Sequence, residues 1–396
     1  MEGPGAAEIA GARAAIGDIA RHTPVLPSAT LTERCGSEVV LKAESLQRTG
    51  SFKLRGALNK LAALGEEGCA RGVVAGSAGN HAQAVAHAAR ARGVPCEVFM
   101  PIGAPIAKVE GAEALGAKVT FHGHSVDECL VAARARADES GMAFVHAFDD
   151  PEVVAGQGTL GLELLEDVPD LAKVVIPVGG GGLAAGVAIA IKTQRPEIEV
   201  VGVRVDAPLS IADGIAVKHI GVLTGALLER WVDDLVLVPE DDIAEAIVLL
   251  MEKAKLVVEG AGAVGAAALV GGQTTAARHG TTVVVLSGGN VDAGLLAEVA
   301  RRHETLAGRR LVVFTKVADR AGSLARLLAT VGETGANLVD VQHLREGVDL
   351  HVRETGVQLV LETRGREHAL QVLAAIGAAG YEVRATTTPA VTATQA

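Results

Sequence analysis

Short runs of aliphatic and β-branched residues alternate with longer, helix-like patterns as far as about residue 300. The apolar runs predict strands at 38–42, 72–76, 95–100, 119–121, 174–178, 200–205 and 283–286. Helical patterns follow several of them, at 52–64, up to residue 92 and at 184–192. This alternation is typical of parallel sheets covered by helices, so we predict an α/β fold with binding sites at the carboxyl ends of its strands.

The pattern changes beyond residue 300. Residues 301–310 are charged and carry no strand pattern, which predicts a linker. The order then becomes strand 311–317, helix 322–332, strands 336–344 and 356–363, helix 367–379 and strand 381–385. A β-α-β-β-α-β order predicts a ferredoxin-like unit. We therefore predict domains at 1–300 and 311–386, with a disordered Thr/Ala-rich tail at 387–396.

The amino-acid composition limits the kinds of molecule that the protein is expected to bind. The chain has 396 residues, 49% of them hydrophobic, and a formal net charge of −11 without a cluster of Lys and Arg. This charge argues against a nucleic-acid partner. The cysteines, at 35, 69, 96 and 129, lack metal-ligand spacing and fit a reducing cytoplasm.

No membrane segment is expected. The N-terminus lacks the layout of a signal peptide. The apolar run 174–191 is long enough to be weighed as a membrane span, but it contains Pro177 and four consecutive glycines. We interpret it as strand, glycine loop and helix, and we predict a soluble, cytoplasmic protein.

Lys53 is the first candidate for chemistry. Ser51 is a suitable N-cap for the helix that follows, which places Lys53 in the first helical turn. The helix dipole and partial burial beside Phe52 and Leu54 both lower the pKa of a lysine there. A lysine with a lowered pKa suits Schiff-base chemistry, because only the neutral amine attacks a carbonyl. The alternative is a surface lysine paired with Glu44.

The glycines Gly179, Gly180, Gly181 and Gly182, followed by Leu183, open a helix directly after a strand. Their amides and the helix dipole predict a phosphate site. Gly180, Gly182 and Ala185 also match a dinucleotide fingerprint, with Arg204 where an acidic ribose ligand is expected. An enzyme that uses NADP could accept that arginine. Nicotinamide binding would, however, leave Lys53 without a role.

Two further turns follow strands. Ser77, Ala78, Gly79, Asn80 and His81 form an anion-binding loop suited to a carboxylate, in which Asn80 could also donate to a phenolate oxygen. Ser287 could bond a ring nitrogen. Helix capping by Ser77 or Asn80, and packing by His81, are the alternatives. Together with Lys53 and the phosphate loop, these turns indicate a pyridoxal-phosphate enzyme that acts on an amino acid.

Four segments carry a family resemblance. They read Ser-Phe-Lys-Leu-Arg-Gly-Ala at 51–57, Ser-Ala-Gly-Asn-His-Ala-Gln at 77–83, Gly-Gly-Gly-Gly-Leu at 179–183 and Ser-Gly-Gly-Asn at 287–290. In this order they resemble the motifs of the threonine dehydratases, which have the tryptophan-synthase-β-like fold (type II) of pyridoxal-phosphate enzymes. The resemblance covers residues from about 15 to 300.

The resemblance implies roles for these residues. Lys53 carries the cofactor, and Phe52 packs against its ring. The Gly179 to Gly182 amides, followed by Leu183, hold the phosphate. Asn80 contacts the ring hydroxyl and Ser287 the pyridine nitrogen. The substrate carboxylate docks on residues 77–81.

The last domain resembles an ACT domain, a small regulatory module. Asp-Arg-Ala-Gly-Ser-Leu at 319–324 is similar to its glycine turn, with Ala321 in place of proline, and Gly-Ala-Asn-Leu at 335–338 to its second landmark. The resemblance implies that Gly322 and Asn337 bind an amino-acid effector at a dimer interface, and that the protein is a homodimer or homotetramer. A domain used only for oligomerisation is the alternative.

The implied reaction is α,β-elimination, which converts L-threonine into 2-oxobutanoate and ammonia, with L-serine as a side substrate. A serine racemase or serine dehydratase on the same fold is the nearest competitor. Racemases of this family carry a serine at the position of Ala78, which favours dehydration here. Biosynthetic members feed isoleucine synthesis and catabolic ones degrade threonine, and the sequence leaves both roles open.

One segment departs from the family. Between Asp206 and Ile211 the family has a longer insert, and Arg204 replaces its usual acidic residue. We therefore predict no metal site. The shortening keeps open a non-catalytic protein that only senses an amino acid.

Overall fold

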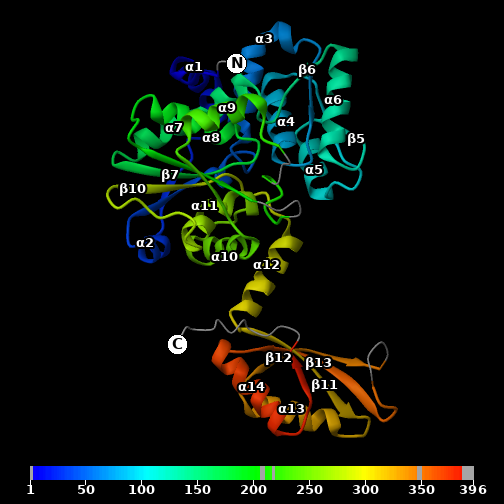
Figure 1. Cartoon of the computed structure of the whole chain (residues 1–396). Helices are drawn as coiled ribbons and strands as arrows, with labels where there is room; N and C mark the ends of the chain where they lie inside the picture. Colours follow the sequence, from blue (N-terminus) through cyan, green and yellow to red (C-terminus); the bar gives the residue numbers. More distant parts are fainter. Residues whose placement is uncertain (1–2, 206–209, 216–218, 346–349, 386–396) are drawn as a thin grey trace. The chain divides into compact units, whose positions relative to one another are not determined.

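The computed structural model describes residues 3–205, 210–215, 219–345 and 350–385. Packing divides the chain into two units, Met1–Ala293 and Gly294–Ala396. Figure 1 shows two largely parallel sheets in the first unit and an antiparallel sheet in the second.

The larger sheet of the first unit has the strand order β1-β2-β10-β7-β8-β9. Only the β1–β2 pair is antiparallel among these strands. The strands β2, β7, β8 and β10 read as continuous apolar runs, as expected for strands covered on both faces. The strand bounds are β1 Val25–Pro27, β2 Val39–Ala43, β7 Leu171–Pro177, β8 Glu199–Arg204, β9 Asp234–Leu237 and β10 Thr281–Leu286.

The smaller sheet of the first unit is wholly parallel, with the order β5-β4-β3-β6. It is formed by one continuous stretch of chain between β2 and β7. Its strands are β3 Val73–Gly76, β4 Cys96–Met100, β5 Lys118–Phe121 and β6 Ala143–Phe144. Each sheet has its own hydrophobic core, so this unit consists of two separately packed halves.

Helices cover both sheets. Their bounds are α1 Ala6–Ile16, α2 Ala29–Cys35, α3 Lys53–Cys69, α4 Asn80–Arg92, α5 Ile106–Ala114, α6 Val126–Ser140, α7 Pro151–Asp167, α8 Gly182–Lys192, α9 Val222–Trp231, α10 Glu240–Leu249 and α11 Gly260–Val270. Short turns η1 Gly17–Ile19 and η2 Glu44–Leu46 are 3-10 helices, and η3 Leu250–Ala254 is a π-helix. None of the helices within the described ranges is long and apolar enough to cross a membrane.

The topology brings distant segments together. β10 lies between β2 and β7, so the turns that leave these three strands meet at one edge of the larger sheet. These turns lead to Lys53, Ser287 and the Gly179–Gly182 loop. The Phe52 amide donates to the Ser287 carbonyl at 3.1 Å, and the Gly289 amide donates to the Gly50 carbonyl at 2.9 Å. The site segments are therefore joined by backbone hydrogen bonds.

The second unit has the predicted β-α-β-β-α-β order. Its antiparallel sheet has the order β12-β13-β11-β14, and its core is lined by α13 and α14. Helix α12 precedes it. The bounds are α12 Ala293–Leu306, β11 Arg310–Ala318, α13 Ser323–Glu333, β12 Asn337–Leu344, β13 Glu354–Glu362, α14 Arg366–Ala378 and β14 Val383–Ala385.

The stretch 301–310 contains the end of α12 and the first residue of β11, and its role as a linker between domains stays a prediction. One local prediction is wrong. Ser51 does not cap α3, because its backbone forms a bridge with Gly288 and its Oγ has no partner within the described part of the chain. The predicted tail 387–396 and most of the shortened segment 206–211 lie outside the described residues.

Candidate active site

One cavity of about 640 Å³ lies between the two halves of the first unit. It is lined by every candidate cofactor and substrate residue of this unit: Phe52, Lys53, Ser77, Ala78, Gly79, Asn80, His81, Gly179, Gly180, Gly181, Gly182, Leu183 and Ser287. Its volume is in the usual range for a small-molecule site. The sequence motifs therefore meet in space.

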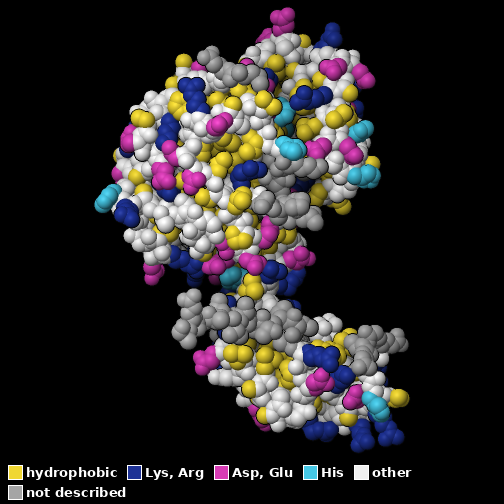
Figure 2. Space-filling view, viewed as in Figure 1, with side chains coloured by type: hydrophobic (Ala, Val, Ile, Leu, Met, Phe, Trp, Pro, Cys, Tyr) yellow, Lys and Arg dark blue, Asp and Glu magenta, His cyan; other side chains and the backbone are white. Residues whose placement is uncertain are grey.

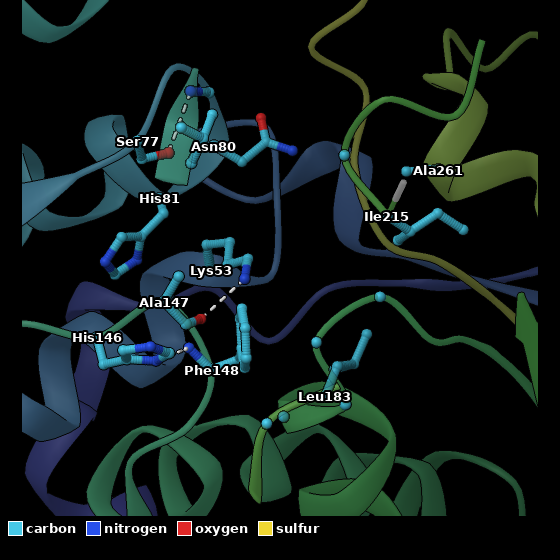
Figure 3. Close-up of a pocket in the computed structure, with 18 of the residues that line it drawn as sticks. Lys53, Ser77, Asn80, His81, His146, Ala147, Phe148, Leu183, Ile215 and Ala261 are labelled. Atoms are coloured by element: carbon cyan, nitrogen blue, oxygen red, sulfur yellow. Dashed lines mark hydrogen bonds between the residues drawn. The ribbon is translucent and has the colours of Figure 1, made fainter. Parts of the chain in front are cut away.

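Lys53 is the first residue of α3, as predicted, and its side chain points into the cavity (Figure 3). Its Nζ donates to the Ala147 carbonyl at 2.8 Å and lies 5.2 Å from the centre of the Phe52 ring. Burial lowers the pKa of Lys53 to about 8, while the charge of Glu259 acts in the opposite direction. Its amine forms no ion pair with another described residue, and the proposed partner Glu44 binds Arg55 instead.

The glycine loop joins β7 to α8. A Cβ on Gly180 would lie 2.3 Å from the Phe148 ring, so a larger residue cannot occupy this position without displacing that ring. No amide from Gly179 to Leu183 donates to another residue that the structure describes. These amides, together with the start of α8, are available to bind an anion.

Asn80 is held by two contacts at the start of α4. Its Nδ2 donates to Glu259 Oε1 at 2.7 Å, and its Oδ1 accepts from Asn290 Nδ2 at 2.8 Å. It does not cap its own helix. The alternative of simple capping is therefore wrong for Asn80, whose amide is oriented by residues from the other half.

Ser77 and Ser287 end strands β3 and β10 at the cavity. Ser77 Oγ accepts from the Gly79 amide at 3.2 Å, which shapes the turn that exposes the following amides. Ser287 is 2% exposed, and its Oγ donates to the Ala261 carbonyl at 3.4 Å. Since that contact is long, the hydroxyl remains able to bond a ligand.

Burial lowers the pKa of two histidines of the cavity, His81 and His146, and keeps both neutral. Burial lowers the pKa of His81 to about 3, and the charge of Lys53 adds to this effect. Its Nε2 bonds the Val145 carbonyl at 2.9 Å, which holds the ring in place, and its part in the substrate loop stays a prediction. Burial also lowers the pKa of His146 to about 4. His146 Nδ1 accepts from the Asp149 amide at 2.8 Å, which leaves Nε2 as its protonated nitrogen.

Sequence reasoning missed Glu259. This residue is 6% exposed and precedes α11, and burial raises its pKa to about 7. Asn80 donates to its carboxyl group, and the charges of Lys53, Lys108 and Asp213 all act on it. A single glutamate before a Gly/Ala-rich helix carries no motif. Only the contact with Asn80 identifies it.

The proposed effector residues belong to the second unit and are not brought together within it. Gly322 precedes α13 near the end of β11, where Ala318 pairs with Glu354. Asn337 starts β12 and pairs with Glu362, at the opposite end of β13. The separation along that strand is roughly 25 Å, too far for one amino acid to contact both.

Comparisons with known proteins identify similar sequences and structures. A family model described as pyridoxal-phosphate dependent enzyme matches residues 16–288. The chain is 43% identical to an L-threonine ammonia-lyase of Thermotoga maritima over 95% of this chain and 98% of that protein. It is also 43% identical to an L-threonine ammonia-lyase of Geobacter sulfurreducens, over 92% and 94% of the two chains. The structure of maize serine racemase is similar with a TM-score of 0.72 and 32% identity, covering 76% of this chain and 98% of that one.

Proposed function

The chain belongs to the family of pyridoxal-phosphate dependent enzymes, and from this membership we propose that it deaminates L-threonine to 2-oxobutanoate and ammonia. One observation carries the proposal. Lys53, with a pKa of about 8, shares a cavity with two anion-binding loops, one at Ser77–Asn80 and one at Gly179–Gly182. Two relatives that match almost the whole chain are named L-threonine ammonia-lyase, which supports this choice of substrate.

The residues present fit the cofactor. The amides from Gly179 to Leu183, which donate to no other described residue, suit its phosphate, and Phe52 supplies an aromatic face beside the Lys53 amine. Ser287 Oγ suits an uncharged ring nitrogen, because a hydroxyl can donate to it without supplying a negative charge. Asn80 Nδ2 has a second hydrogen available for a ring oxygen.

Pyridoxal phosphate, when bound, withdraws electrons from the Cα of the attached amino acid. Lys53 supplies the nucleophile that holds the cofactor, and its neutral amine then accepts the Cα proton. The amides around Ser77 and Gly79 bind the substrate carboxylate. Ala78 offers no side-chain proton at its position in that loop, which favours loss of the β-hydroxyl over racemisation. His81 and His146 stay neutral near pH 7 and do not compete with Lys53 for the proton.

The test is a direct assay of the purified protein with pyridoxal phosphate and L-threonine. We expect a visible absorption band from the lysine-bound cofactor and steady formation of 2-oxobutanoate. Lys53→Ala should lose both, whereas Lys60→Ala should retain both. Lys60 is a suitable control because it lies on the same helix and pairs with Asp150 at 2.7 Å. A bound cofactor without turnover of threonine would contradict the proposed substrate.

Serine distinguishes the competing activities. L-Serine lacks only the methyl group of threonine, so we expect pyruvate formation with kcat/KM lower by roughly 10- to 200-fold. The similarity to maize serine racemase makes the racemase the second candidate. Chiral analysis of residual serine checks it, since accumulation of D-serine faster than pyruvate would favour racemisation.

The second unit is proposed to bind an amino-acid effector between two copies of the chain. Residues Asn337 to His343 of β12 are exposed throughout, and β12 has a neighbour on one side only. Antiparallel pairing of two β12 strands would place Asn337 of one copy near the Gly322 end of the other. The exposed outer edge of β12 supports this ACT-like regulatory role and a dimeric protein.

Val339 offers a test of this arrangement, because it lies on β12 and is 62% exposed. Val339→Lys should convert the dimer to a monomer and abolish the response of threonine turnover to added amino acids, including isoleucine. Val352→Lys is the matched control, since Val352 is 94% exposed but lies outside β12. Sedimentation measures the size, and an unchanged dimer in Val339→Lys would contradict the proposed interface.

A further inference from the structure

The cavity is formed by two halves that pack separately. Ser77 and Gly79 come from the half built on the four-stranded sheet, and Gly180 and Ser287 from the half built on the six-stranded sheet. The buried cores of the two halves are distinct. Access to the cavity therefore depends on the contacts that hold the halves together.

Lys108 and Asp213 form one of these contacts. Lys108 Nζ lies 3.1 Å from Asp213 Oδ2, and both residues line the cavity. Lys108 lies on α5, in the four-stranded half, whereas Asp213 lies between β8 and α9, in the six-stranded half. Both charges also act on the pKa of buried Glu259, Asp213 raising it and Lys108 lowering it, so their influence reaches the interior of the site.

Each partner is attached to its own half. The segment of Asp213 is fixed to α10 of the six-stranded half by the Ile211 amide, which donates to Glu240 Oε2 at 3.0 Å. On the other side, Ala112 anchors α5 in the core of the four-stranded half. A relative motion of the halves must therefore break or form this ion pair.

We propose that the Lys108–Asp213 ion pair is a latch that holds the cavity closed over its ligands. Its exposure suits a contact that opens during turnover, because Lys108 is 17% and Asp213 60% exposed. Ion pairs this accessible are weak and readily broken, and salt weakens them further. Lys108 and Asp213 are positioning residues and take no part in the bond changes.

The experiment measures how fast the holoprotein loses pyridoxal phosphate in cofactor-free buffer, from the decay of the visible band. Lys108→Gln and Asp213→Asn should each speed the loss by about two- to fivefold, as expected for removal of an exposed pair. The double variant that combines Lys108→Asp with Asp213→Lys restores the attraction, and its rate should return close to that of the unaltered protein. High salt should speed the loss from the unaltered protein but not from Lys108→Gln.

Lys192→Gln is the matched control. Lys192 lies 2.7 Å from Asp233 with exposures of 12% and 41%, and both residues belong to the six-stranded half. This variant should lose the cofactor at the unaltered rate. Equal rates in Lys192→Gln and Lys108→Gln, or a charge-swapped variant as fast as the single variants, would overturn the latch.

The proposed latch has a second readout besides the rate of cofactor loss, namely the KM for L-threonine. Only this second readout rests on the proposed function. Each single variant should raise KM for L-threonine with little change in kcat, since the latch retains the ligand and does not act in the chemical step. Failure to turn over threonine would refute the proposed function and leave the cofactor-loss result standing. A kcat that falls while KM and the rate of cofactor loss stay constant would refute the latch.

Discussion

Lys53 and Arg55 lie close together at the start of α3, yet their surroundings differ completely. The Arg55 guanidinium is fully buried and paired with Glu44 at 2.8 Å and Glu163 at 2.6 Å. The Lys53 amine contacts the Ala147 carbonyl and two aromatic rings. Burial lowers the pKa of both groups, but Glu44 and Glu163 reverse this effect for Arg55, whose pKa rises above its usual value.

This difference shows that one set of residues anchors helix α3 and a different set surrounds its reactive lysine. Lys42 extends the cluster of Arg55, since its Nζ lies 2.7 Å from Glu163 and 3.0 Å from Asp167. These ion pairs join β2, η2, α3 and α7. Because these carboxylates are bound to Arg55 and Lys42, they do not pair with Lys53. The lysine therefore keeps a pKa near 8 on a firmly held helix.

The largest effect on activity should come from replacing Lys53 with arginine, the residue type found at position 55. Lys53→Arg keeps a cation at the site but cannot supply a neutral amine, because the pKa of a guanidinium stays above the working range. We expect no visible cofactor band and a fall in threonine turnover of roughly 100- to 10,000-fold, the range for loss of a positioned proton acceptor. Lys60→Arg on the same helix should change turnover little. A visible band in Lys53→Arg would mean that another amine holds the cofactor.

The next effect comes from removing a partner of Arg55. Glu44→Gln leaves the buried Arg55 guanidinium with one carboxylate partner instead of two. This variant should lower the free energy of unfolding by about 3 to 5 kcal/mol. Urea unfolding measures this change. Glu197→Gln serves as a control, because the Arg195–Glu197 pair is 34% and 64% exposed and should contribute little to stability. Equal losses in the two variants would contradict the role given to the cluster.

The smallest effect should come from Glu259, which acts on Lys53 from the other side of the cavity. Its pKa rises from 4.5 to about 7 in the folded protein, so folding favours the protonated carboxyl group. The stability from this group is present below about pH 4.5 and is lost as the pH rises through 7, by up to roughly 3 kcal/mol. Glu259→Gln should remove that dependence, which unfolding at about pH 5 and about pH 8 measures.

The same variant tests the effect of Glu259 on Lys53. Because the charge of Glu259 raises the pKa of Lys53, Glu259→Gln should shift capture of pyridoxal phosphate by the apoprotein to lower pH. In the unaltered protein the capture rate should rise with pH and level off above about 8. An unchanged profile in Glu259→Gln would show that the two groups do not interact.

The sequence predicted those parts of the site that local motifs encode. Lys53, the Gly179–Gly182 loop and Ser287 each follow a strand, and the alternation of strands and helices predicted that their turns share one edge. The order of elements in the second unit followed from periodicity in the same way. These features depend on neighbouring residues, and are therefore visible in a single sequence.

Contacts between distant residues could not be predicted. Ser51 has the composition of an N-cap, but its backbone is drawn into a bridge with Gly288. Glu259 carries no local signal and gains its role only by binding Asn80. The buried cluster is similar, since Arg55 and Glu163 become partners only when α3 packs on α7. In each case contacts with residues far away in the sequence set the role of the residue, and the local sequence does not show these contacts.

The position of β10 has a consequence for synthesis of the chain. β10 pairs with β2 on the side toward the centre of the sheet, with Val283 beside Val40. β10 leaves the ribosome roughly 240 residues after β2. At 5 to 20 residues per second this interval lasts roughly 12 to 50 s. During that time β2 has a free parallel edge, and Lys53 lacks the strand that ends in Ser287. The nascent chain can therefore assemble its cofactor pocket only when most of the first unit has been translated.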